Sequence, residues 1–532
     1  MHSTFCKGGK TRLIALSAAM LASLAFSGNA LAGVSQSGEQ KDMKRVGHVD
    51  LQGRASYQPN VIEYPDGRTI AFAGTHNGSK PNPLNGNVVE NNGVMIIDVT
   101  DPKKPVEKFH IPAPAGGQSQ SVRMCLGSDL PGGTSGKVYL LRNVQGGASS
   151  GYQVWDVTNV SGPTLVSSIL GLRRTHKPWW ECKTGIAYLP GSKAAPAPIW
   201  RQSQSLLIYD WKNPASPVYL RTFGLPGGQP GASGPIPTSL HGAISAYEHP
   251  NAAGKLARSA TASDIIGNRV YTAWGVGDNG VMQILDRNKL LPAIAGGSYT
   301  GPADTPTNAD LLFSQAGILH MSPDQGGHTS MPVFGMKPPS YQGFTEFQTR
   351  DIVLLASEAT SNKCNEAPHW SFVVDVTVEN SLVGTAGPPA LGALPNPWQG
   401  PMVLSTMSVD PRAGEKYKRG NYCARGARFG VHSSEENFRN PYYGKLTFIA
   451  YFTGGVRAWD IREPQAPVEV GFYVPESNAN TTADGYMTNN VEVDNRGYVY
   501  VVDRNGAGLD ILQLSGKAKK IGFPDGKDDD DD

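Results

Sequence analysis

Four histidines stand just ahead of predicted strands in this chain of 532 residues: His176, His241, His328 and His432. Each belongs to a different copy of a longer repeat, so a closed arrangement of the copies would bring the four imidazoles together. Neutral imidazoles on separate rigid strands suit Cu, Fe, Zn or Mn. We therefore predict a candidate transition-metal site, with Glu181 and Glu435 as weaker candidates for ligands or for partners of the ligands.

A second interpretation of these histidines stays open. The inner strand ends of a ring carry backbone groups that need polar partners, and histidines there can serve as hydrogen-bonded lining. No compact metal-binding motif such as H-E-x-x-H occurs in the sequence. The catalytic residues, and whether a metal cofactor is present, therefore stay unknown at this stage.

The elements that must position the histidines form a repeat. Copies begin at Gly93, Gly151, Ser205 and Gly455, and the clearest reads GVRAWDIREPQAPVEVG. In each copy an alternating apolar run ends in Asp, a polar turn follows, and a second alternating strand comes next, which is typical of a β-hairpin. Two further apolar segments precede most copies. Each unit therefore holds about four strands, the content of one propeller blade.

Seven aspartates mark seven such units: Asp98, Asp156, Asp210, Asp286, Asp375, Asp460 and Asp510. The seventh unit stops at Leu514 without an outer strand, while residues 45–51 form an unpaired strand with the pattern of an outer strand. We therefore predict an all-β fold over residues 33–514, a seven-bladed β-propeller of four-stranded blades. The N-terminal strand would complete the last blade and close the ring.

The hairpin copies GVMIIDVTDPKKPVE and GVRAWDIREPQAPVEVG resemble LVIVD repeats, a motif of exported bacterial and archaeal proteins. The resemblance extends through the repeats over nearly all of the chain that follows residue 33, and it implies a β-propeller. It implies no activity, because the family has no catalytic signature that maps onto residues of this sequence.

The two ends of the chain have their own patterns. Residues 1–32 combine Lys7, Lys10 and Arg12 with an apolar stretch and a small-residue cleavage site, Ala30 to Ala32. This pattern predicts a signal peptide and a periplasmic or secreted protein with no transmembrane segment after signal removal. Residues 515–532 are Lys-rich and end in five aspartates, and we expect a disordered tail there.

Four of the five cysteines follow the signal, an even number that suits disulfides in an oxidising compartment. Sequence alone leaves three pairings open. We favour Cys125–Cys182 and Cys364–Cys423, because each bridge would join loops of neighbouring repeat units.

Charge excludes one class of partner. The formal net charge is +2, charged residues make up 17% of the chain, and no basic stripe is present, so nucleic acid is not an expected partner. The leading hypothesis is a binding or interaction protein that holds a small-molecule or protein ligand at the loop-rich mouth of the channel. The alternative is a metal-dependent enzyme, an oxidoreductase or a hydrolase, that uses the four histidines.

Overall fold

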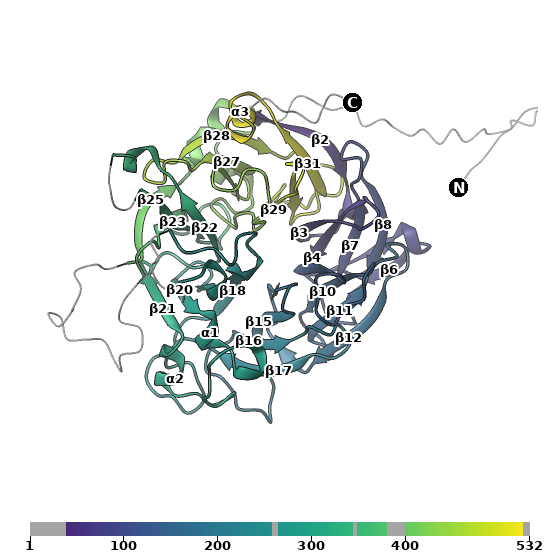
Figure 1. Cartoon of the computed structure of the whole chain (residues 1–532). Coiled ribbons are helices and arrows are strands. Elements are labelled where there is room, and N and C mark those ends of the chain that lie inside the picture. Colours follow the sequence, from purple (N-terminus) through teal and green to yellow (C-terminus); the bar gives the residue numbers. More distant parts are fainter. Residues whose placement is uncertain (1–38, 258–263, 344–347, 380–399, 525–532) are drawn as a thin grey trace, which may run out of the picture. The chain divides into compact units, whose positions relative to one another are not determined.

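The alternating apolar runs form the predicted strands in the computed structural model, which describes residues 39–257, 264–343, 348–379 and 400–524. The strands build seven antiparallel sheets around a common centre, with one extra two-stranded hairpin (Figure 1). Six sheets have four strands, and the third blade has five because its inner strand is split in two. The prediction of a seven-bladed β-propeller is confirmed.

The first five blades use strands that follow one another along the chain, each from the centre outward. Blade one has β3 (Ser56–Glu63), β4 (Thr69–Thr75), β7 (Val94–Asp98) and β8 (Val106–Ile111), and blade two has β9 (Val122–Leu126), β10 (Val138–Val144), β11 (Gly151–Asp156) and β12 (Thr164–Leu170). Blade three has β13 (Leu172–Arg173), β14 (Trp179–Trp180), β15 (Ile186–Lys193), β16 (Ser205–Asp210) and β17 (Val218–Phe223), and blade four has β18 (Leu240–Ser245), β19 (Arg269–Trp274), β20 (Val281–Asp286) and β21 (Gln315–His320). Blade five has β22 (Thr329–Met336), β23 (Arg350–Ala356), β24 (Ser371–Asp375) and β25 (Met402–Met407). The extra hairpin, β5 (Ser79–Asn82) with β6 (Val88–Asn91), is inserted between β4 and β7.

The last two blades are completed by the N-terminal segment of the described chain. In blade seven, β29 (Thr488–Val493), β30 (Val499–Asp503) and β31 (Leu509–Leu514) take β2 (Met43–Val49) as their outer strand, and β2 pairs with β31. The predicted closure of the ring is confirmed. Blade six receives an outer strand that the sequence did not predict, because β1 (Glu39–Lys41) pairs with β28 (Val468–Val474) beyond β27 (Val456–Asp460) and β26 (Leu446–Ala450).

The repeat has a common local chemistry. Six of the seven aspartates end a strand and fold back on the turn, so that Asp98 accepts a hydrogen bond from the Thr100 backbone N–H at 3.1 Å and Asp156 accepts one from Thr158 at 3.0 Å. The seventh, Asp510, lies at the start of β31. The small residue that opens a copy is needed because the outer strand passes close by: a Cβ on Gly93 would overlap the backbone oxygen of Ile111. Each third strand also has a bulge against its outer strand, which increases the twist of the blade.

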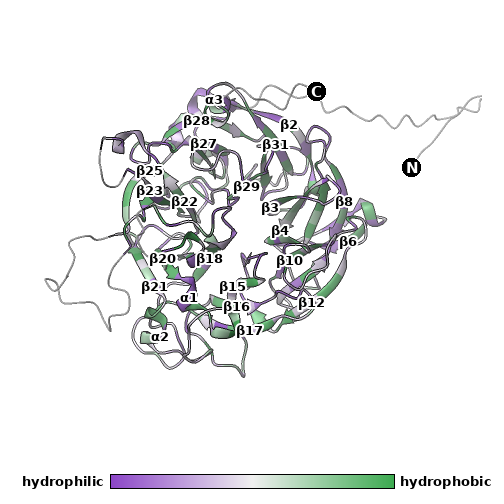
Figure 2. Ribbon diagram, in the orientation of Figure 1, coloured by the Kyte–Doolittle hydropathy of each residue, from purple (hydrophilic) through white to green (hydrophobic). Residues whose placement is uncertain are grey.

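Hydrophobic residues are frequent along the strands (Figure 2), and their buried side chains form clusters that join neighbouring sheets. Both favoured disulfides are present, and in each the Cα atoms lie 5.4 Å apart. The bridge Cys125–Cys182 joins blades two and three, and Cys364–Cys423 joins the loops of blades five and six. The structure therefore confirms the cysteine pairing.

The C-terminal segment departs from the expectation of a tail that starts at residue 515. Residues Gly516–Gly522 form the helix α3, which packs against β27 and β28 and buries Ala518 and Ile521. Those two apolar side chains explain why this Lys-rich segment folds on the propeller. Two other short helices are α1 (Arg287–Leu290) and α2 (Asn308–Leu312). Residues 1–32 and the aspartate run lie outside the described part, within which no helix is long and apolar enough to cross a membrane.

Candidate metal centre

The first strand of each blade faces the axis of the ring, and neighbouring first strands contact one another, as β29 contacts β3 and β18 contacts β22. These strands begin at one end of the ring and finish at the other. We call the end where they begin the histidine mouth, because the four predicted histidines meet there. The opposite end is the carboxylate mouth, defined below.

Irregular backbone presents the side chains of the histidine mouth. His241 is the bulged residue of β18, where the register with β19 shifts between Leu240 and Gly242. His176 lies in the break between β13 and β14. His432 lies in a segment that precedes β26 and pairs with it through His432 N–H to the Ala450 oxygen, without being a regular strand. Bulges and breaks change the direction in which a side chain points, so these side chains point toward the axis of the ring and not into the space between blades.

The four imidazoles form a continuous row. His176 Nε2 and His241 Nε2 are 2.8 Å apart, the rings of His241 and His328 have centroids 3.7 Å apart, and those of His328 and His432 are 4.4 Å apart. The structure therefore brings together all four residues that the sequence singled out, from blades three to six.

Hydrogen bonds to the backbone determine which nitrogen of two rings carries the proton. His241 Nδ1 lies 2.9 Å from the backbone oxygen of His328, and His432 Nδ1 lies 2.6 Å from that of Asn489. A carbonyl oxygen only accepts, so each Nδ1 is the donor and each neutral ring keeps a lone pair on Nε2. His432 Nε2 is buried and has no hydrogen-bond partner.

A carboxylate completes the group. Glu358, 6% exposed, follows β23, and its Oε2 lies 3.6 Å from His328 Nε2 while its Oε1 lies 3.7 Å from His432 Nε2. Oε1 also accepts a hydrogen bond from Arg428 at 2.8 Å. Possible ligand atoms of His241, His328 and Glu358 all lie within 4.8 Å of one another.

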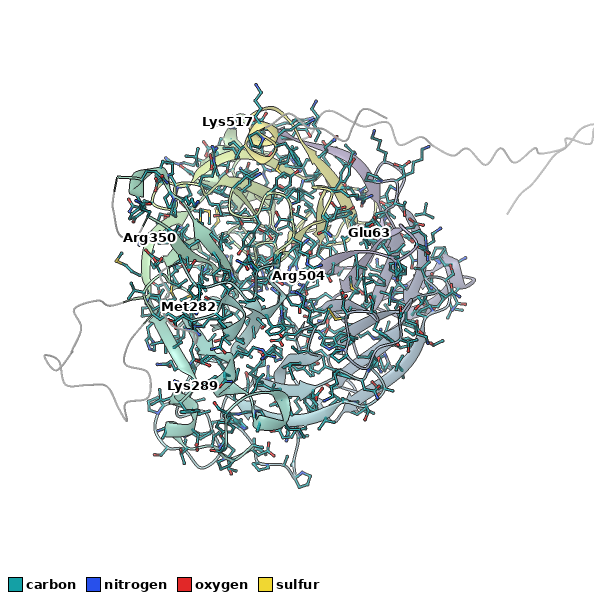
Figure 3. All side chains as sticks on the ribbon, in the orientation of Figure 1. Glu63, Met282, Lys289, Arg350, Arg504 and Lys517 are labelled. Carbon is teal, nitrogen blue, oxygen red and sulfur yellow. A yellow bond between two sulfur atoms is a disulfide. The ribbon has the colours of Figure 1, made fainter. Side chains whose placement is uncertain are left out.

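Three further residues of the mouth were not predicted. Tyr57 Oη lies 3.2 Å from His176 Nε2 and 3.5 Å from His328 Nε2, His76 follows β4, and Arg504 follows β30 near the centre of the ring (Figure 3). The four predicted histidines all lie at or near the start of the first strand of a blade. Antiparallel pairing also brings the ends of second strands to this mouth, which is how His76, Glu358 and Arg504 reach it.

Burial keeps the histidines neutral. Desolvation, reinforced by Lys177 and Arg504, lowers the pKa of His176 to about 3. Burial also lowers the pKa of His241, His328 and His432 well below the ordinary value. The pKa of Glu358 is raised by burial, and Arg504 and Arg428 oppose that shift. The mouth therefore offers neutral imidazole nitrogens, the form that binds metals.

A cavity of about 330 Å³ adjoins the group. Its lining includes Tyr57, His176, His241 and Glu358 together with a wall of amides and Arg504. A metal ion held by two histidines and one carboxylate would have open coordination positions, and the cavity gives a small molecule access to them.

The weaker candidate ligands lie elsewhere. Glu181 is fully buried between blades three and four, where it accepts hydrogen bonds from Arg287 at 2.7 Å and from Tyr188 at 2.9 Å. Glu435 accepts from the backbone N–H of Asn437 at 3.2 Å, toward the other end of the ring. Both carboxylates are held by these partners, and the structure does not bring either one to the histidines.

The carboxylate mouth has a different composition. Glu436 is buried and paired with both Lys177 and Arg123, and Lys177 also donates to Thr329 Oγ1 at 3.2 Å. Beside them is a cavity of about 560 Å³ lined by Glu492 and by Trp179, whose ring lies 4.5 Å from the Arg123 guanidinium. Trp179 and Trp180 are buried here as parts of the core.

Comparison with known proteins supports the architecture. The family model described as "LVIVD repeat" matches residues 88–111, which cover β6, β7 and β8. The sequence matches no curated protein.

Similar solved structures include a hypothetical selenium-binding protein from Sulfolobus tokodaii, with 11% identity, a TM-score of 0.43 and coverage of 87% of this chain and 92% of that one. Hydrazine synthase from Kuenenia stuttgartiensis has 10% identity, a TM-score of 0.44 and coverage of 88% and 97%. Sqt1 from Chaetomium thermophilum has 10% identity, a TM-score of 0.43 and coverage of 89% and 99%. Likenesses at this level say nothing about activity. The chain therefore contains a matched LVIVD repeat within a seven-bladed β-propeller.

Proposed function

We propose that this propeller is an exported metalloprotein that binds a transition-metal ion at the histidine mouth and uses it to act on a small molecule. The ligands would be His241, His328 and Glu358, with His432 as the next nearest donor. Two imidazoles and one carboxylate are a ligand set used by both non-haem iron oxygenases and zinc hydrolases. The reaction class is therefore an oxidation or a hydrolysis.

One observation carries this proposal. The hydrogen bond from His241 Nδ1 to a backbone oxygen makes its Nε2 an acceptor, which lies 2.8 Å from His176 Nε2 and beside His328 and Glu358. A metal ion at this position would replace the proton that His176 shares with His241. Glu358 is itself held through Oε1 by Arg428, so its Oε2 stays available. Metal-binding histidines and carboxylates in proteins are usually held by such outer hydrogen bonds. His432 Nε2, the next nearest donor, is buried without a hydrogen-bond partner and could add to this ligand set.

The chemistry of such an ion would be to polarise a bound oxygen or to activate a water molecule or dioxygen. The chain's own residues have separate tasks. Arg428 orients Glu358, the backbone oxygens of His328 and Asn489 orient two of the rings, and Tyr57 closes one side of the group.

Export is supported by the two disulfides, which suit an oxidising compartment.

The test is the metal content of the purified full chain, measured by elemental analysis after loading with Fe, Zn, Mn or Cu and removal of free ion. We expect about one ion per chain, as for a single site of this type. A double variant, His241→Ala with His328→Ala, should lose at least 90% of that content while it stays folded by circular dichroism. His320→Ala is the matched control, because this exposed histidine ends β21 on an outer strand.

Metal-free protein after each loading, or a double variant that keeps its ion, would contradict the proposal. The histidines would then be hydrogen-bonded lining, and the protein would be a binding scaffold that uses the same mouth without a metal.

A further inference from the structure

The cavity at the histidine mouth is polar on nearly every side. Besides the residues of the candidate metal centre, its lining consists of His76, Asn77, Gln118, Gln120, Gln145, Gln204, Val276 and Arg504. Val276 is the aliphatic member of this set. Small-molecule sites are usually lined mainly by apolar and aromatic side chains, so this cavity suits a hydrophilic ligand, and its volume of about 330 Å³ suits a small one.

Charge in the lining is unbalanced. Glu358 and Arg504 are its charged members, but Glu358 already pairs with Arg428 at 2.8 Å, while Arg504 Nη1 lies 3.8 Å away from it. Two guanidinium groups therefore share one carboxylate. The surplus positive charge belongs to Arg504, whose Nη2 lies 3.1 Å from His76 Nε2 and whose side chain is 17% exposed.

The amide wall has unused acceptors. The side-chain amides of Gln118 and Gln120 both donate to Gln145 Oε1, while their own oxygens are buried without a partner. Unpaired buried acceptors are uncommon in native proteins and point to a water molecule or a ligand group that donates to them. A ligand hydroxyl is such a group, and an aliphatic chain offers none.

We infer that the cavity binds a small hydroxycarboxylate, with its carboxylate on Arg504 and its hydroxyl on the amide wall formed by Gln118, Gln120 and Gln145. That this molecule is the substrate rests on the proposed function, whereas its binding depends only on residues of the chain. Guanidinium groups bind carboxylates through charge-assisted hydrogen bonds, and a metal ion in the centre would add further positive charge.

The test uses lactate as the probe, propane-1,2-diol as its uncharged counterpart, and inorganic phosphate as the competing anion. Titration calorimetry is run on metal-free and on metal-loaded full-length protein. We expect lactate to bind at least tenfold more tightly than the diol in both forms. Arg504→Gln should weaken lactate binding at least tenfold and leave diol binding unchanged, and Arg504→Lys should have an intermediate effect.

Arg412→Gln is the matched control, since this exposed arginine pairs with Asp410 away from the cavity, and the variant should bind lactate like the wild type. Arg504→Gln should also keep the wild-type metal content, so a failure of ligand binding is distinguishable from a failure of the metal centre. Equal binding of lactate and the diol, or unchanged lactate binding in Arg504→Gln, would overturn the inference. Binding of phosphate without lactate would overturn it as well.

Discussion

The two mouths of the ring differ in how their buried polar side chains are stabilised. At the histidine mouth, burial keeps the histidines neutral, and several lone pairs are left without a donor. At the carboxylate mouth, Glu436 stays ionised because Lys177 and Arg123 outweigh the effect of burial and lower its pKa. Removing one member of a buried charged group destabilises the fold because its partners stay buried and charged, whereas neutral groups with free lone pairs are available for a ligand. We therefore expect substitutions at the carboxylate mouth to affect stability most, and substitutions at the histidine mouth to affect ligand binding most.

The largest effect should come from a change that breaks the charged group. Glu436→Gln leaves Lys177 and Arg123 buried without a counter-charge, and we expect the free energy of unfolding to fall by about 3–5 kcal/mol. His432→Gln removes a neutral side chain of similar burial and should cost no more than about 2 kcal/mol. Urea unfolding of both variants at pH 7 measures the two values. Equal losses would remove the distinction between the mouths.

An intermediate effect is expected from the disulfides, one of which lies at each mouth. Cys125 and Cys182 line the cavity of the carboxylate mouth, while Cys364 and Cys423 hold the loops that carry Glu358 and Arg428. Replacing either pair by serine should lower the free energy of unfolding by about 2–4 kcal/mol.

Only the change at Cys364 and Cys423 should also weaken metal binding, by at least tenfold, because it loosens the segment that orients Glu358. The Cys125 and Cys182 double variant is the control of equal covalent change. Equal metal affinity in the two double variants would show that the bridge has no part in the centre.

The smallest effect concerns Glu435, whose pKa burial raises to about 8, with Glu436 adding a like charge. Between pH 4.5 and 8 the folded state keeps this proton while the unfolded state has lost it, so the wild type loses stability as the pH rises through that window. Glu435→Gln has no carboxyl group to ionise. We expect the variant to gain at least about 1 kcal/mol relative to the wild type at pH 8.5, compared with their difference at pH 4.

Chemical unfolding at the two pH values measures this gain, and metal content should stay unchanged because Glu435 does not reach the histidines. Glu63→Gln is the control, since Glu63 is exposed at the same mouth (Figure 3). If Glu435→Gln changed the free energy of unfolding by the same amount at both pH values, the effect would come from packing and not from ionisation of Glu435.

Sequence reasoning predicted the blades because their causes are local. Alternation, the Asp turn and the small residue before the third strand recur in each copy, and four histidines at equivalent positions then had to converge. Tyr57 and Glu358 were missed for two physical reasons. A bulge in β3 places Tyr57 on the axis, and alternation does not predict bulges. Glu358 arrives at the mouth by antiparallel pairing from the end of β23, which becomes visible only when both strands are placed.

The N-terminal strands have a consequence for the order of folding. β2 pairs with β31, so His48 lies opposite Asp510, and a contact across more than 460 residues completes the last blade. Each of the first five blades needs only strands that are consecutive in the chain. Blades six and seven are completed only when β28 and β31 pair with the N-terminal strands, and until then the edges of these two blades are open to pairing with other chains. Of all parts of the molecule, the first strands of the described chain are therefore the poorest place for an affinity tag.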